Sequence, residues 1–204
     1  DYARWARERG AYIVEDDYDS DFASVSRRIE TICSLAPERV IYINTFSKIL
    51  APSMRMGFMV LPEGLLGEYE RRLGFYSCTV SNFEQYTLAR FISGGYFEKH
   101  INRMRLYYSR QRKRLLDSLQ NSRLSRICSV NENESGLHFL IRLNTAMPEQ
   151  EIARRLKKAG IHLQSLSEYF LVPDKSKEYY YIISYSDVDV DDVQEAFDEI
   201  YRCV

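Results

Sequence analysis

The sequence predicts an α/β protein in which a parallel sheet with helices on both faces is followed by a long helix and a small α+β domain. Residues 40–43, VIYI, are apolar on both faces of a strand, which is typical of a parallel sheet covered on both sides. Strand-like and helix-like segments alternate along the chain. Beyond about residue 125, three short strand-like runs and two helical runs follow one another closely, as in a separate small α+β domain.

The first domain is expected over residues 1–95. It begins with the end of a helix over 2–8, which Gly10 terminates. The strands that follow are rich in β-branched or aromatic residues and are bounded by turn residues, and the last part of the domain has a helical pattern. They are strands over 11–16, 40–44 and 56–62, the last closed by Pro62, and helical structure over 63–92 before a break at Gly94 and Gly95.

A long amphipathic helix is expected over residues 96–121, because its apolar residues recur close to every 3.6 positions. They are Phe97, Ile101, Met104, Tyr108, Leu115 and Leu119. The small C-terminal domain follows over 122–204. Its expected elements are strands at 136–143, 161–166 and 179–186, a helix at 148–160 and a final helix from about Val190.

Composition excludes several classes of protein. The 204 residues include 28 basic and 29 acidic side chains, a net charge of −1 that gives no electrostatic footprint for DNA or an anionic membrane. No segment is long and apolar enough for a membrane span, and we expect a cytoplasmic protein. The cysteines form no CxxC pair, so neither a disulfide framework nor a metal site is indicated. His138 is expected to be a packed strand residue, and His100 and His162 have no carboxylate or cysteine partner at metal-ligand spacing.

Lys48 stands in a polar turn directly after the strand over 40–44. Ligands of open α/β sheets bind beyond the carboxyl ends of the strands, so this lysine is placed where chemistry is expected. A lone lysine in a turn is most simply a solvated residue. Five neighbours change that interpretation: a carboxylate and a phenol after the adjacent strand, two hydroxyls and a guanidinium, from Asp16, Tyr18, Thr45, Ser47 and Arg55.

Together these side chains could form a binding site for pyridoxal 5'-phosphate. The carboxylate would keep the pyridine nitrogen protonated, the phenol would bind the ring hydroxyl, and the lysine amine would form a Schiff base. The hydroxyls and Arg55 would hold the phosphate by charge-assisted hydrogen bonds. We expect Lys48 to be buried beside Arg55, because burial and a like charge favour the neutral, nucleophilic amine.

Three motifs, EDDYDSDF, TFSKILAPSMRMGFMVLP and HINRMRLYYSRQRKRLLDSL, resemble the aminotransferase-like domain of the MocR subfamily of GntR transcription regulators. That domain has the class I aminotransferase fold, a PLP-dependent transferase fold. The resemblance implies that Lys48 carries the Schiff base, Asp16 binds the pyridine nitrogen and Tyr18 binds the ring hydroxyl. It also implies that Thr45 and Arg55 are phosphate ligands.

The resemblance sets expectations for what surrounds the chain. The family's large domain has an earlier half, with a phosphate-binding turn, a stacking aromatic and an asparagine, and its regulators carry an N-terminal winged helix-turn-helix. We expect both to lie outside these residues, so that the chain is an N-terminally truncated piece and DNA is contacted only through the absent domain. Weak or absent cofactor loading of this chain alone, an exposed sheet edge and a homodimer are expected as well.

The terminal strand departs from the family pattern. Ile182 stands where the family usually has an arginine that binds the substrate α-carboxylate. An isoleucine cannot make that bidentate pair, although Arg142 or another residue could serve. Two functions therefore remain: an effector domain that binds PLP and a small amino compound, or an active class I/II aminotransferase. A winged helix-turn-helix before residue 1 would select the first.

Overall fold

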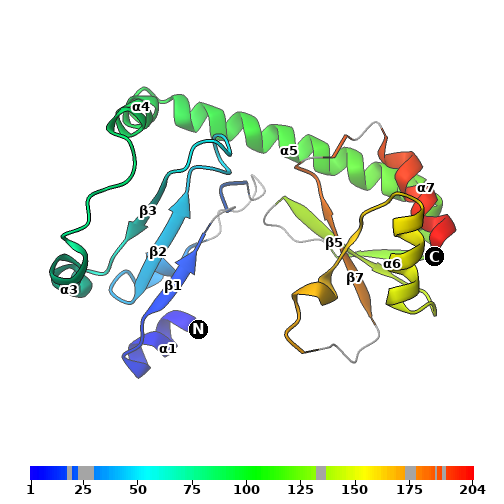
Figure 1. Ribbon diagram of the computed structural model, residues 1–204, viewed down its shortest axis with the longest axis horizontal. Coiled ribbons are helices and arrows are strands. Elements are labelled where there is room, and N and C mark those ends of the chain that lie inside the picture. The colour runs from blue at the N-terminus through cyan, green and yellow to red at the C-terminus, as the bar shows by residue number, and fades with distance from the viewer. Residues whose placement is uncertain (18–19, 23–29, 132–136, 173–177, 187, 190–191) are drawn as a thin grey trace. The chain divides into compact units, whose positions relative to one another are not determined.

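The computed structural model describes residues 1–17, 20–22, 30–131, 137–172, 178–186, 188–189 and 192–204. The chain divides into two compact units, residues 1–105 and 106–204 (Figure 1). The boundary lies inside the long helix α5, Tyr96–Asn121, which confirms the helix predicted from the 3.6-residue period. Both units therefore share one continuous helix.

The sheet of the first unit has the strand order β1-β2-β3. Strands β1 (Ile13–Asp16) and β2 (Val40–Thr45) are parallel, and β3 (Gly57–Val60) runs antiparallel to β2. All three strands were predicted, and the expected parallel pairing holds for β1 and β2 but not for β3. The loop between β2 and β3 spans residues 46–56, and a chain that returns to the adjacent strand over so short a loop must reverse its direction.

Four helices of the first unit have these bounds: α1 Tyr2–Arg9, α2 Ile32–Leu35, α3 Glu63–Leu73 and α4 Asn82–Ser93. A short 3-10 turn covers Ser20–Phe22. Helix α1 ends at Gly10 as predicted, with a φ of 63° that glycine adopts without strain. The helical structure expected over 63–92 is present as two helices: Gly74 is the C-cap residue of α3, and Ser81 is the N-cap residue of α4 without a side-chain hydrogen bond.

One edge of the first unit exposes apolar surface. All four residues of β3 are exposed, and the larger three, Phe58, Met59 and Val60, have exposed fractions between 41% and 48%. Helix α3 buries none of its residues. Figure 1 shows that β3 leads into α3 and that a long loop joins α3 to α4. The unit therefore presents an edge strand whose apolar side chains lack a covering layer among the described residues.

The second unit contains an antiparallel sheet with the order β4-β5-β7-β6. Its strands are β4 Cys128–Asn131, β5 His138–Leu143, β6 Gln164–Ser165 and β7 Tyr179–Ser184. Its helices are α6 Glu149–Lys158 and α7 Val193–Cys203, with short 3-10 turns at Arg123–Arg126 and Leu166–Tyr169. Strand β4 was not predicted, and the strand expected over 161–166 shortens to two residues.

The core of the second unit lies on one face of this sheet. Alternate residues of β5 and β7 are buried, including Phe139, Ile141 and Tyr181. They are joined by buried residues from the helices, namely Ile152 and Leu156 of α6 and Val193, Phe197 and Ile200 of α7. The intervening strand residues, including Ile182, are half-buried on the other face. The sheet thus has one closed and one open face, as its alternating pattern requires.

Candidate functional site

The carboxyl ends of β1 and β2 bring two predicted site residues together. Asp16 pairs with Ile43 in the parallel register, and Thr45 follows two positions further along β2. Because strand residues two apart point to the same face, Asp16, Ile43 and Thr45 share one face of the sheet. The carboxylate of Asp16 is exposed and Thr45 is half-buried. Tyr18, the expected partner of the ring hydroxyl, lies outside the described residues.

Asp17, directly after β1, is held by hydrogen bonds on the face of the sheet opposite to Asp16. Its backbone N–H donates to the Ile43 carbonyl at 2.9 Å, and its carboxylate accepts a hydrogen bond of 2.8 Å from the Tyr42 hydroxyl. The Asn44 side-chain amide donates to that same hydroxyl at 2.9 Å, and Asn44 is buried. The Asn44 side-chain oxygen in turn accepts from the Thr45 N–H at 2.6 Å. These bonds tie the two strand ends together.

The electrostatics of this hydrogen-bonded group favour protonated side chains. Burial raises the pKa of Tyr42 to about 12, the Asn44 bond opposes the rise, and Asp17 adds to it. The hydroxyl is therefore a donor to Asp17 at all physiological pH values. Burial, and then the nearby Asp17 charge, raise the pKa of Asp21, while Arg105 and the Asn44 side chain lower it.

Lys48 lies in a tight turn that follows β2 directly. The Leu50 N–H donates to the Phe46 carbonyl at 2.9 Å, which closes the turn, and the Phe46 N–H donates to the Met56 carbonyl at 2.9 Å, which closes the loop. The side chain of Lys48 is exposed, whereas its neighbour Ile49 is buried. The expectation that Lys48 is buried is therefore wrong for this chain, because the turn directs Ile49 inward instead.

Ser47 and Arg55, the two expected phosphate ligands at the ends of this loop, lie together. The Ser47 hydroxyl donates to the Met54 carbonyl at 2.5 Å, and the Arg55 guanidinium donates to the Ser47 oxygen at 3.4 Å. Arg55 remains exposed. The Ser47 hydrogen is taken by the Met54 carbonyl, so the exposed Arg55 guanidinium is the group at this point that suits an anionic phosphate.

His100 on α5 contacts the lysine turn, a role that the sequence did not predict. Its Nε2 lies 2.8 Å from the Ile49 carbonyl oxygen, and since a carbonyl only accepts, the ring N–H is the donor. Phe97, one turn earlier on α5, packs its ring at 6.0 Å from that of Phe46. The contact joins residues far apart in the chain, so no local motif indicated it.

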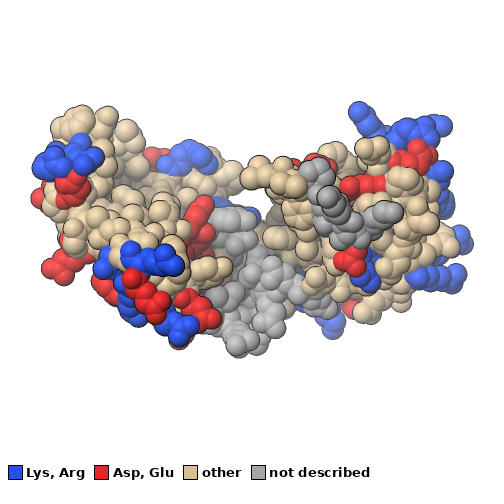
Figure 2. Space-filling view, turned by 90° about the horizontal axis from the view of Figure 1, so that it is seen from below, with Lys and Arg blue, Asp and Glu red and all other residues tan. Residues whose placement is uncertain are grey.

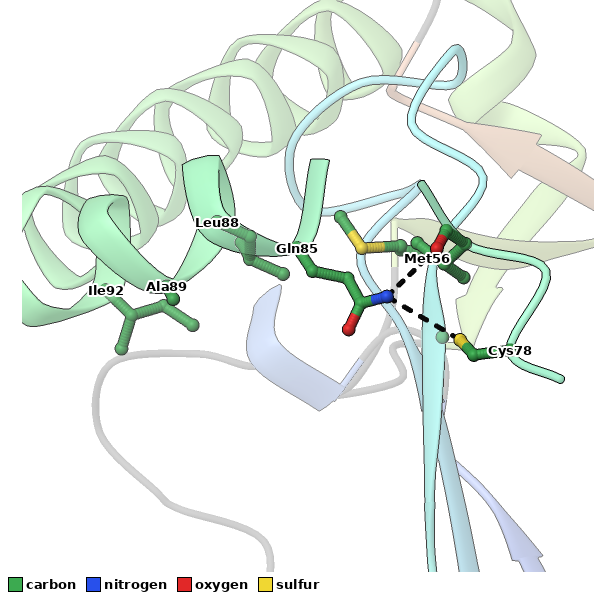
Figure 3. A pocket seen from close by; sticks show the side chains of 8 residues that line it. Met56, Cys78, Gln85, Leu88, Ala89 and Ile92 are labelled. Atoms are coloured by element: carbon green, nitrogen blue, oxygen red, sulfur yellow. Dashed lines mark hydrogen bonds between the residues drawn. The ribbon is translucent and has the colours of Figure 1, made fainter. Parts of the chain in front are cut away.

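A small apolar cavity of about 290 Å³ lies beside this region (Figure 3). It is lined by Met56 and Gly57 at the start of β3, by Cys78 and Val80, and by Gln85, Leu88, Ala89 and Ile92 of α4. The Gln85 amide donates to the Val80 carbonyl at 2.9 Å and lies 3.7 Å from the Cys78 sulfur. None of the five predicted site residues that the structure describes lines the cavity, although Gly57 pairs with Thr45 across the sheet.

In the second unit, Ile182 is half-buried on the open face of β7, between Leu140 and Gln164. Arg142, the other candidate for carboxylate binding, donates to Glu178 at 2.9 Å. Its Nε is buried and makes no hydrogen bond to the described residues. Arg142 is therefore already paired with a carboxylate of its own unit.

Three other features bear on the class of ligand: potential metal ligands, apolar helices and surface charge. Across the described ranges, no group of three His, Cys, Asp or Glu side chains is arranged to hold a metal ion. In the same residues, no helix has the length and apolar character needed to cross a bilayer. On the face shown in Figure 2, acidic and basic side chains are interspersed. Opposite charges also pair in ion pairs such as Arg7–Glu38 and Arg71–Glu68.

Comparison with known proteins agrees with this geometry. Residues 1–200 match the family model for aminotransferase class I and II. The chain is 37% identical over 165 residues to the uncharacterized HTH-type transcriptional regulator YdeL of Bacillus subtilis, covering 80% of this chain and 35% of that protein. It is 32% identical over 192 residues to the "Probable rhizopine catabolism regulatory protein MocR" of Rhizobium meliloti, covering 93% and 38%.

Among solved structures, the kynurenine aminotransferase of Pyrococcus horikoshii superposes with a TM-score of 0.81 and 26% identity, over 99% of this chain and 50% of that one. The chain thus spans about a third to a half of the length of these relatives. The predicted resemblance to the aminotransferase-like part of MocR-type regulators and the predicted fold are confirmed. By its sequence and its fold, the chain belongs to the class I and II aminotransferase family.

Proposed function

We propose that the chain is the pyridoxal 5'-phosphate-binding effector domain of a bacterial MocR-type transcription regulator, with the cofactor attached covalently through Lys48. One observation carries this proposal. The parallel register of β1 and β2 puts Asp16 and Thr45 on one face of the sheet at the carboxyl ends of the two strands. The turn that holds Lys48 follows the end of β2 directly. This is where ligands of α/β sheets bind.

The donor set fits the cofactor. The exposed carboxylate of Asp16 suits a protonated ring nitrogen, and the Lys48 amine suits an aldehyde carbon. The exposed Arg55 guanidinium and the Thr45 hydroxyl suit the phosphate, whereas the Ser47 hydroxyl would have to exchange its bond to the Met54 carbonyl for one to the phosphate. When bound, the cofactor would supply an electron-withdrawing ring and a reactive carbonyl, which the protein's own side chains cannot provide. The structure of the Pyrococcus horikoshii aminotransferase was solved in complex with PMP, which supports the proposal that this chain binds a ligand of the same class.

The role as a regulator rests on the relatives. YdeL is named as an HTH-type transcriptional regulator and MocR as a regulatory protein. We propose that DNA is bound by a separate helix-turn-helix region, that the protein is a homodimer, and that a small amino compound is the effector. Such an effector must bind two states of the protein with different affinity in order to change its activity.

An active aminotransferase is the second candidate, and the similarity to the Pyrococcus horikoshii enzyme favours it. Ile182 argues against it, since the side chain on the open face of β7 is apolar where a carboxylate must be held. We therefore rank the effector domain first.

Spectroscopy of the full-length protein tests the proposal. With added pyridoxal phosphate, the wild type should acquire a visible absorption band that survives gel filtration. Lys48→Ala should abolish this band, while Lys113→Ala, a change at an exposed lysine of α5, should leave it intact. Arg55→Ala should weaken cofactor retention. A wild type that stays colourless in excess cofactor would refute the assignment of Lys48.

A further inference from the structure

Helix α5 holds both segments that carry the candidate cofactor residues, and it does so by side-chain hydrogen bonds to backbone carbonyls. His100 donates to the Ile49 carbonyl at 2.8 Å, one residue after Lys48. Arg105 Nε donates to the Asp21 carbonyl at 2.6 Å, in the segment that follows Asp16. One helix therefore contacts the lysine turn and the acidic segment, which are far apart in sequence.

These two contacts belong to one short, well-anchored stretch of helix. His100 and Arg105 are five residues apart, which corresponds to about 7.5 Å along the helix axis. Both side chains are half-buried, and Ile101 between them is buried. The carboxylate of Asp21 also faces the Arg105 guanidinium, which adds charge attraction at the second contact. A shift of this stretch would therefore disturb both carbonyls together.

We propose that His100 and Arg105 are positioning residues that couple cofactor occupancy to the position of α5. The inference rests on the proposed function, since it takes Lys48 and Asp16 as cofactor contacts. By linkage, if the position of α5 changes the affinity of the lysine turn for cofactor, bound cofactor stabilises the higher-affinity position of α5 by the same free energy. The same helix continues to Asn121 in the second unit, so the bias reaches beyond residue 105 through the continuous backbone.

A purely structural role would make a different prediction. Two side chains that only brace the loops would stabilise the protein equally with and without cofactor. A coupling role requires that cofactor changes the protection of α5, and that this change depends on the two hydrogen bonds. Hydrogen exchange of the peptide covering residues 96–105, measured with and without pyridoxal phosphate, distinguishes the two.

The experiment uses full-length wild type, His100→Ala, His100→Gln and Arg105→Ala. The matched control is Arg103→Ala, which removes an exposed arginine from the same stretch of α5. We expect pyridoxal phosphate to slow exchange of residues 96–105 in wild type and in the Arg103 variant. The slowing should be lost in both alanine variants at His100 and Arg105, with the Kd for cofactor raised about 2- to 10-fold by the loss of one hydrogen bond.

His100→Gln keeps an N–H donor and should restore part of the cofactor effect, which also guards against a misfolded alanine variant. The proposal is overturned if wild type binds the cofactor but its α5 exchange does not change, or if the His100→Ala and Arg105→Ala variants show the full wild-type slowing. A wild type without any visible band is a different result, because it removes the proposed function itself and the coupling with it.

Discussion

The hydroxyl of Tyr42 donates a 2.8 Å hydrogen bond to Asp17 from the face of the sheet opposite to Asp16. Two adjacent carboxylates at the end of β1 therefore have different surroundings. Asp16 is exposed on the face it shares with Thr45, while Asp17 is bound to β2 through Tyr42 and Asn44. We infer that Asp17 fixes the strand end that presents Asp16.

Tyr42→Phe should lower the free energy of unfolding by about 1–3 kcal/mol, because Asp17 and Asn44 would each lose a buried or half-buried hydrogen-bond partner. Tyr86→Phe is the control, since the Tyr86 side chain is 74% exposed and its change should stay within about 0.5 kcal/mol. Urea unfolding of both variants measures the difference. Equal stabilities would show that the bridge between the strand ends contributes nothing.

Asp21→Asn should raise stability at pH 7 and have little effect near pH 3. Burial raises the pKa of Asp21 in the folded state above its ordinary value of 3.8, so folding favours the protonated form. That contribution is complete below about pH 3.8 and is lost as the pH rises through the folded-state pKa. Denaturant unfolding between pH 3 and pH 7 provides the test. A variant less stable than wild type at pH 7 would contradict it.

Gly57 and Gly67 should respond in opposite ways to alanine. A Cβ at Gly57 would lie 2.9 Å from the Asn44 backbone oxygen, so Gly57→Ala must move β2 or β3 and should cost about 1–3 kcal/mol. At Gly67, inside α3, a Cβ meets no atom within 4 Å, and alanine should stabilise the helix by about 0.5–1 kcal/mol. Thermal or urea unfolding of the pair checks both signs.

The 204-residue chain by itself should self-associate more strongly than a complete domain, through the exposed edge strand β3. Unpaired strand edges with apolar side chains favour pairing with another chain. Val60→Lys should shift the species seen by light scattering toward smaller mass, because it places a charge on that edge. Leu171→Lys, at an exposed apolar residue of the second unit, should not. A wild-type chain that is monomeric at high concentration would contradict self-association through this edge.

Common α-amino acids should be converted slowly or not at all by the cofactor-loaded full-length protein. Ile182 occupies the position expected for the carboxylate-binding arginine, and Arg142 is paired with Glu178 at 2.9 Å. Stopped-flow mixing with a panel of amino acids would follow the visible band of the cofactor. Rapid conversion to the pyridoxamine form would favour the aminotransferase instead.

The sequence by itself determined the elements whose pattern is local. The period of apolar residues predicted α5, the apolar run predicted β2, and Gly10 marked the end of α1. The motifs around Asp16 and Lys48 identified the family, because each is a short run of consecutive residues. The same positions remain predictions as cofactor contacts, with Tyr18 among them.

Only the tertiary structure decided which distant groups meet. It made β3 antiparallel, exposed Lys48, and split the helical stretch after Leu73. It also brought His100 to the Ile49 carbonyl and Arg105 to the Asp21 carbonyl. A carbonyl is present in every residue, so a side chain that bonds to one leaves no mark on the partner's sequence. Such contacts follow from how the packed helix and loops lie together, which no local pattern encodes.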